Sequence, residues 1–183
     1  MSHPVPPPRV KIFLAAYGAD PALLDRAIQE FRSFKDGILK EPDILSRDFP
    51  ITETNYYAPE MGPHLLKRYL SYPCHLDPGD LVDLKLFSWE LEEKYHKDLK
   101  RQVNLDPGYI FSGGLVLSTG KFSGHRLYLG RGVWGELTLL YCSGTFTALP
   151  WTYRDYLIPE VVEILKRMRK AYFFLEKTYP KEG

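Results

Sequence analysis

The sequence is poor in cysteine and contains no long hydrophobic run. Its 183 residues include two cysteines, Cys74 and Cys142, which form no CxxC pair. They predict reduced thiols in a cytoplasmic protein, with one disulfide between them as the alternative, and they cannot form a zinc site by themselves. The longest apolar stretch, residues 12–17, is far shorter than the ~20 residues that cross a bilayer. We therefore expect a protein that does not span a membrane.

Neither sign of charge dominates the chain. It carries 24 Lys and Arg residues against 23 Asp and Glu residues, so a net charge of +1 gives no bulk attraction to DNA or to an anionic membrane. A content of 44% hydrophobic and 26% charged residues is typical of a folded globular protein. Proline-rich residues 1–8 predict a disordered tail, and residues 9–183 predict a single α+β domain.

Three helices are expected from local signals. Residues 10–17 are an apolar run typical of a strand buried on both faces. An Asp-Pro pair at residues 20–21 predicts the start of a first helix, the same pair at residues 77–78 predicts a second, and Pro159 predicts a third. In the second helix, acidic residues that include Glu92 lie around the apolar stripe.

The remaining segments predict short strands. Residues 103–150 alternate strand-forming residues with glycines and include an antiparallel hairpin of residues 135–141 and 145–149. Residues 65–72 predict a further strand that ends at Pro73. The order of elements predicts an α+β fold, in which an antiparallel or mixed sheet has about three helices packed on one face. A ferredoxin-like βαββαβ start fits this order.

Residues 113–121 end in Gly-Lys like a phosphate-binding loop but lack its spacing. Five residues separate Gly114 from Gly120 where a P-loop has four, and Phe122 follows Lys121 where a P-loop has Ser or Thr. A short apolar segment between two glycine turns explains this sequence better.

Two residues are candidates for acid–base chemistry, and two arginines are candidates for binding an anion. Asp106 precedes Pro-Gly, which predicts a turn that fixes its carboxylate; alternatively, Asp106 only caps that turn. His125 titrates near neutral pH, and Arg126 and Arg131 suit phosphate or carboxylate because guanidinium donates paired hydrogen bonds. In a strand, His125 and Arg126 would point to opposite faces. The alternative is a polar hairpin edge.

Aromatic residues near these positions are candidate stacking surfaces for a ligand. They are Tyr128, and Trp151 and Tyr153 before the last helix; alternatively, they seal the core. A tyrosine-rich loop further upstream is long enough to cover a site. Its candidate ligand-binding residues are Asn55, Tyr56 and Glu60.

Five motifs extend over most of the chain. They are TNYYAPEMG at 54–62, LKLF leading to ELEEK at 84–94, NLDPGY at 104–109, HRLYLG at 125–130 and PWTY at 150–153. Together they resemble an uncharacterised prokaryotic family, domain of unknown function 4416, whose members have about this length. Members often carry the label GTP-binding protein, but the resemblance implies no catalytic residue. The chain itself has neither a P-loop nor an Asn-Lys-x-Asp motif that would read a guanine base.

These features predict the binding of a small anionic ligand, a nucleotide or phosphorylated metabolite, with acid–base catalysis by Asp106 and His125. We expect no zinc; magnesium would accompany a nucleotide, and any other cofactor is unknown. The alternative is a non-catalytic interaction module that docks a protein or RNA partner through its tyrosine-rich surface. A pocket that gathers Asp106, His125 and an arginine would favour the first function, and a flat exposed aromatic or basic patch the second.

Overall fold

The computed structural model describes residues 3–51, 61 and 64–178. Residues 3–9 form no helix or strand and are exposed, and the disorder of the tail stays a prediction. Within the described ranges, no helix is long and apolar enough to cross a membrane.

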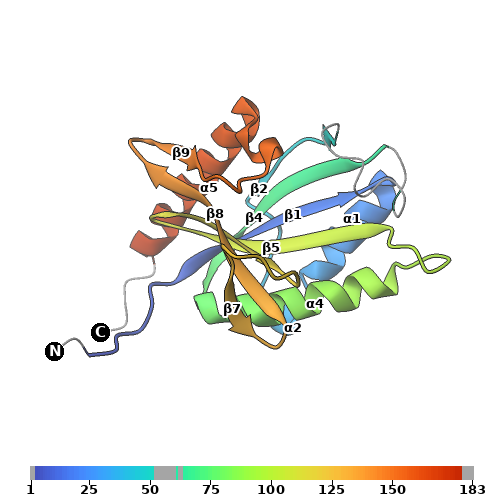
Figure 1. Ribbon diagram of the computed structural model, residues 1–183, viewed down its shortest axis with the longest axis horizontal. Coiled ribbons are helices and arrows are strands. Elements are labelled where there is room, and N and C mark those ends of the chain that lie inside the picture. Colours follow the sequence, from blue (N-terminus) through green and yellow to red (C-terminus); the bar gives the residue numbers. More distant parts are fainter. Residues whose placement is uncertain (1–2, 52–60, 62–63, 179–183) are drawn as a thin grey trace.

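Nine strands form one sheet in the described part of the chain (Figure 1). They are β1 (Val10–Gly18), β2 (Ile44–Leu45), β3 (Phe49–Pro50), β4 (Leu66–Leu76), β5 (Val103–Phe111), β6 (Gly114–Thr119), β7 (Leu127–Gly130), β8 (Val133–Cys142) and β9 (Thr145–Ala148). The helices are α1 (Pro21–Phe31), α2 (Phe34–Gly37), α4 (Leu81–Lys94) and α5 (Pro159–Thr178), with 3-10 helices η1 (Pro78–Asp80) and η2 (Arg154–Leu157).

The strand order confirms the α+β prediction and makes the described sheet antiparallel. Strands follow the order β2-β4-β1-β5-β6-β8-β7, while β3 pairs with β4 and β9 pairs with β8. The first four positions, β2-β4-β1-β5, with α1 and α4 as connections, have the arrangement of a ferredoxin-like βαββαβ unit. The strands from β6 on extend this unit, and β8 and β9 form the predicted hairpin.

Helices cover both faces of the sheet rather than one face as expected. α1 and α4 pack on one face in a core cluster that includes Leu14 and Leu105. η2 and α5 pack on the opposite face in a cluster that includes Phe13 and Ile110 (Figure 1). Successive side chains of a strand point to opposite faces, so two buried faces explain the continuous apolar run of β1.

The predicted helix starts are confirmed. Asp20 Oδ1 accepts a hydrogen bond from the N–H of Ala22 at 2.9 Å and caps α1. Asp77 Oδ1 accepts one from the N–H of Gly79 at 2.8 Å and starts η1, which leads directly into α4. Pro159 is the first residue of α5. These starts were predictable because each depends only on neighbouring residues.

β4 continues through Pro73, so the prediction that this proline ends the strand is wrong. The register between β1 and β4 shifts between Lys11 and Phe13, which leaves residues around Pro73 outside regular pairing. Lys11 is fully buried, and its Nζ donates to the Tyr72 carbonyl and to Asp43 Oδ2, each at 2.6 Å. The ammonium group therefore bonds to the backbone at the bulge.

Candidate functional site

A pocket lies where β5 and β6 separate. Gly108–Phe111 of β5 pair with Gly114–Leu117 of β6, whereas Val103–Pro107 have no partner in β6. β6 continues to Thr119 against β8 instead. Pro107 lies at the point of separation and has no N–H for a further ladder hydrogen bond.

Side chains bond to the backbone groups of β5 that β6 leaves unpaired. The N–H of Leu105 donates to Glu92 Oε1 at 2.7 Å, and Lys85 Nζ donates to the carbonyl of Leu105 at 2.9 Å. Ser118 Oγ donates to the carbonyl of Pro107 at 2.7 Å. Because buried backbone groups need partners, these bonds stabilise a strand that runs past the end of its neighbour.

Lys85 and Glu92 belong to a buried polar stripe of α4 that the sequence analysis missed. Lys85 is 3% exposed, Ser88 0% and Glu92 4%, so Glu92, which was predicted only to flank the apolar stripe, is buried. Burial raises the pKa of Glu92, although the nearby charge of Lys85 opposes the change. Spacings of three and four residues place the three side chains on one helix face, and this spacing was the available signal.

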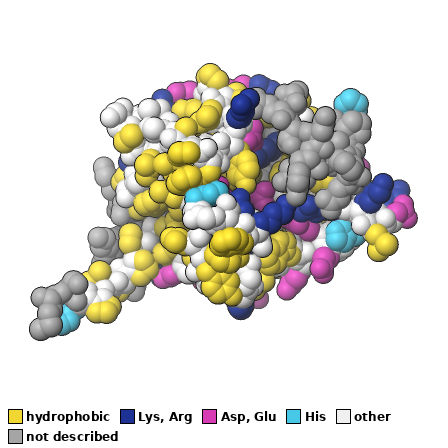
Figure 2. All heavy atoms as spheres, in the orientation of Figure 1, with side chains coloured by type: hydrophobic (Ala, Val, Ile, Leu, Met, Phe, Trp, Pro, Cys, Tyr) yellow, Lys and Arg dark blue, Asp and Glu magenta, His cyan; other side chains and the backbone are white. Residues whose placement is uncertain are grey.

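The pocket has a volume of about 700 Å³ and a cationic lining. Among the described residues, six cationic side chains line it against three acidic ones. The cationic residues are Lys67, Lys85, Lys121, Arg101, Arg126 and Arg154. Figure 2 shows a band of Lys and Arg side chains leading into a hollow on this face of the molecule.

Each of the three lining carboxylates bonds to one cation. The pairs are Lys67 with Asp155, Lys85 with Asp106, and Arg126 with Glu136. Glu92 is outside the lining but adds a further negative charge next to it, because its Oε2 lies 3.3 Å from Arg101 Nη1. Among the described residues, six cations less these four carboxylates leave an excess of two positive charges, which attracts anions.

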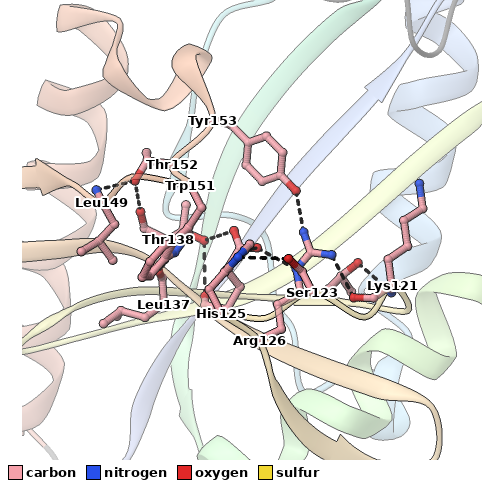
Figure 3. Close-up of polar contacts among 12 residues, drawn as sticks. Lys121, Ser123, His125, Arg126, Leu137, Thr138, Leu149, Trp151, Thr152 and Tyr153 are labelled. Atoms are coloured by element: carbon pink, nitrogen blue, oxygen red, sulfur yellow. Dashed lines mark hydrogen bonds and ion pairs between the residues drawn. The ribbon is translucent and has the colours of Figure 1, made fainter.

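Three acceptors hold the guanidinium group of Arg126 (Figure 3). Its Nε donates to Glu136 Oε2 at 2.7 Å, its Nη1 to the carbonyl of Lys121 at 2.8 Å and its Nη2 to Tyr153 Oη at 3.1 Å. Three of the five N–H groups of a guanidinium are thus engaged, and the planar group is fixed beside the pocket with two donors left.

His125 bonds to the same carboxylate as Arg126. Its Nε2 lies 2.8 Å from Glu136 Oε2, and its Nδ1 lies 3.1 Å from Ser123 Oγ. The imidazole stacks on Trp151, with ring centroids 4.7 Å apart (Figure 3). Both neighbouring side chains reach Glu136 because they precede β7, so the strand rule that would place them on opposite faces does not apply.

Asp106 lies within β5, so the prediction of a turn at Asp-Pro-Gly is wrong. A Cβ on Gly108 would lie 2.3 Å from the carbonyl oxygen of Val116, so the glycine allows β5 and β6 to approach closely. Asp106 Oδ1 accepts from Lys85 Nζ at 3.1 Å. No hydrogen bond joins Asp106 to His125 among the described residues, so the two predicted acid–base residues do not act as a bonded pair.

A partly buried ion pair forms another side of the pocket. Lys67 Nζ and the hydroxyl of Tyr69 both donate to Asp155 Oδ2 at 2.6 Å. The Lys67 ammonium also lies 4.6 Å from the ring centroid of Tyr156. Burial opposes the ionisation of Asp155, but the charge of Lys67 and these hydrogen bonds outweigh it and lower the pKa of Asp155. Asp155 is therefore ionised at neutral pH.

Arg131 and Tyr128 lie outside the pocket lining, although both were candidate ligand contacts. Arg131 pairs with Asp83, and its side chain is 58% exposed. Tyr128 packs on Trp134, with ring centroids 5.0 Å apart. Tyr128 lies within β7, and Arg131 lies in the turn after this strand, where its backbone is left-handed with φ 50°.

The other aromatic and loop candidates have different outcomes. Tyr153 lines the pocket, and Trp151 supports His125 while its Nε1 donates to the carbonyl of Leu137 at 2.8 Å. Three candidates lie outside the described residues, and their roles stay predictions: Asn55, Tyr56 and Glu60.

Cys74 and Cys142 are free thiols. In the ranges that the structure describes, His, Cys, Asp and Glu side chains form no group of three that could hold a metal ion.

Comparisons with known proteins give one match. No curated protein and no solved structure matches the chain. The model of a family described as domain of unknown function (DUF4416) matches residues 10–172, a range that includes the whole lining of the pocket. Because this match covers most of the chain, the protein belongs to the DUF4416 family.

Proposed function

We propose that the pocket binds a small anionic ligand, a nucleotide or phosphorylated metabolite. The observation that carries the proposal is the excess of cationic side chains in a cavity of about 700 Å³. This volume falls within the ~300–1,000 Å³ of small-molecule sites. The two free thiols support the cytoplasm as the location of the protein.

Arg126 is the proposed phosphate ligand. Its side chain is 11% exposed and keeps two N–H donors beyond those bonded to Glu136, Lys121 and Tyr153. A partly desolvated guanidinium binds phosphate more strongly than an exposed one because water screens it less. Arg154 also contributes a guanidinium to the lining and is exposed.

Two aromatic side chains of the lining offer surfaces for a planar or sugar ring. Trp89 comes from α4, and Tyr153 comes from the segment before η2. The ring of Trp89 lies beside Gly120, where a Cβ would come within 2.7 Å of it. Glycine therefore leaves room for the indole at the pocket wall.

If the ligand is a substrate, Asp106 is the better placed of the two predicted acid–base residues. It lines the pocket, whereas His125 lies behind Glu136 and Arg126. We propose His125 as a positioning residue that orients the shared carboxylate. Asp106→Asn should then slow turnover of any bound phosphate ester, measured as product formation by phosphorus NMR, while His125→Gln should weaken ligand binding instead.

A thermal-shift screen tests the binding proposal. The purified protein is mixed with nucleotides, sugar phosphates and inorganic phosphate, each with and without magnesium. A ligand at 100 times its Kd adds about 2.7 kcal/mol, which raises the melting temperature of a domain of this size by roughly 5–10 °C. Failure of every phosphate compound to shift the melting temperature would contradict the proposal.

Arg131 provides the matched control for Arg126. Arg131→Ala removes the same charge from a pair that lies outside the pocket. Arg126→Ala, but not Arg131→Ala, should therefore reduce the ligand-induced shift by roughly half or more.

An exposed apolar surface beside β7 favours protein binding as a second candidate function. Phe122 is 73% exposed, Leu127 75% and Tyr128 60%. β7 is also the end strand of the sheet order, so its outer edge offers backbone groups for pairing with a partner strand. Leu127→Lys should abolish association with a protein partner in pull-down assays and leave the thermal shift with phosphate compounds unchanged.

A further inference from the structure

The most buried part of the pocket lining has two hydrogen-bond donors without partners. Asn104 is 4% exposed and Tyr156 is 1% exposed. Asn104 Oδ1 accepts from Arg101 Nη1 at 2.6 Å, which identifies Nδ2 as the remaining donor because arginine cannot accept. Neither this Nδ2 nor the hydroxyl of Tyr156 has a hydrogen-bond partner among the described residues. Such groups are rare in native proteins unless a ligand or water bonds to them.

An unused acceptor lies next to these donors. Asp106 is two residues from Asn104 on the same face of β5. Tyr156 lines the same pocket as Asp106. Burial, above all, raises the pKa of the Tyr156 hydroxyl, and the charge of Asp106 contributes to this change. Lys85 bonds to Asp106 Oδ1, while Oδ2 has no hydrogen bond within the described chain. The Asp106 side chain is 30% exposed and therefore accessible to a ligand.

We propose that Asn104, Asp106 and Tyr156 bind hydroxyl groups of the ligand. This inference rests on the proposed function and narrows the ligand to a phosphorylated sugar or polyol, free or as part of a nucleotide. A hydroxyl oxygen both donates and accepts, so neighbouring hydroxyls satisfy one carboxylate and two donors together.

The charges of the pocket orient this ligand. Its phosphate would be repelled by the open oxygen of Asp106 and attracted by Arg126 and Arg154. The hydroxyl end therefore faces β5, and the phosphate faces the segment between β6 and β7, which carries Arg126.

Titration calorimetry with matched ligand pairs tests the inference. Ribose 5-phosphate is compared with 2-deoxyribose 5-phosphate, and glycerol 3-phosphate with propyl phosphate, with inorganic phosphate as the reference. The more hydroxylated member of each pair can form an additional hydrogen bond to the charged Asp106 carboxylate. We therefore expect it to bind at least ~10-fold more tightly than the other member.

Two conservative variants test which residues cause the preference for hydroxylated ligands. Tyr156→Phe keeps the ring in the core, and Asp106→Asn keeps the shape of the side chain. Each should reduce the preference for hydroxylated ligands by at least threefold. Neither should weaken the binding of inorganic phosphate, because the Tyr156 hydroxyl is uncharged and the Asp106 carboxylate repels phosphate. Arg126→Ala should weaken the binding of all of these ligands.

The outcomes separate the two proposals. Binding of inorganic phosphate with equal affinity for both members of each pair would overturn the hydroxyl inference and leave the anion site standing. A hydroxyl preference that persists in both variants would also overturn the inference, because recognition would then occur elsewhere. The proposed function itself fails if no phosphate compound binds.

Discussion

The sheet departs from regular pairing at several places, and buried lysines lie at two of them. Lys11 at the bulge between β1 and β4 bonds to a backbone carbonyl and to Asp43. Lys85 at the separation of β5 and β6 likewise bonds to a backbone carbonyl and to Asp106. Lys11 is absent from the lining of the 700 Å³ pocket, whereas Lys85 belongs to it.

The difference between the two places shows that a buried charge does not by itself mark a site. Lys11 is 0% exposed and Lys85 is 3% exposed, so burial does not distinguish them. Only Lys85 has further cations around it and an aspartate with an open carboxylate oxygen facing a cavity. The same hydrogen-bonding arrangement therefore stabilises the bulge between β1 and β4, and it lines the candidate site where β5 and β6 separate.

The ion pair of Lys67 and Asp155 on the pocket side should give the largest effect on stability. Asp155→Ala leaves a buried ammonium without its carboxylate and should lower the free energy of unfolding by about 3 kcal/mol at pH 7. The folded-state pKa of Asp155 lies below its unfolded value of about 3.9, so the pair stabilises above that pH. Its contribution is lost as the pH falls through the folded-state value.

Urea denaturation of wild type and Asp155→Ala between pH 2.5 and 7 checks this prediction. The difference in the free energy of unfolding between wild type and variant should become smaller below about pH 4. A difference that stays constant over the whole range would mean that the ion pair is not its source.

Lys11→Met and Lys85→Met test the comparison itself. Each removes a donor from a buried carbonyl and should lower the free energy of unfolding by about 2 kcal/mol. Lys85→Met should also change the affinity for phosphate compounds, because it alters the pocket, whereas Lys11→Met should not. Equal ligand affinities in the two variants would break the distinction between the regions.

The Arg126→Ala variant tests whether the pocket region binds phosphate compounds. Loss of charge-assisted hydrogen bonds should weaken the binding of a phosphate compound by about 10-fold or more, measured by titration calorimetry. An unchanged Kd in this variant would assign the phosphate to another cation of the lining.

Arg131→Ala should have the smallest effect. The exposed pair with Asp83 is screened by water, so the free energy of unfolding should change by less than about 0.5 kcal/mol. A larger loss in urea denaturation would show that the turn after β7 contributes to the core.

The sequence predicted local features better than long-range ones. The helix starts at Asp20 and Asp77 depend on neighbouring residues, so they could be predicted. Pro107 has local turn chemistry, yet it lies in a strand because β1 pairs with it on one side and Ser118 bonds to its carbonyl on the other. No local pattern reports such a contact.

The sequence predicted only part of the candidate site, because the site also depends on long-range contacts. Asp106, Arg126 and Tyr153 line the pocket as candidates from the sequence. Arg131 was predicted with Arg126 because the two are close in sequence, but β7 lies between them, and Arg131 pairs with Asp83 outside the pocket. Lys85 was missed because its role depends on the unpaired edge of β5, which only the assembled sheet reveals.

A crystal structure determined with tungstate, an electron-dense analogue of phosphate, tests the central claim most directly. Tungstate should occupy the pocket at β5 and β6, within hydrogen-bond distance of the Arg126 guanidinium. Tungstate bound only elsewhere on the protein, with this pocket empty, would contradict it.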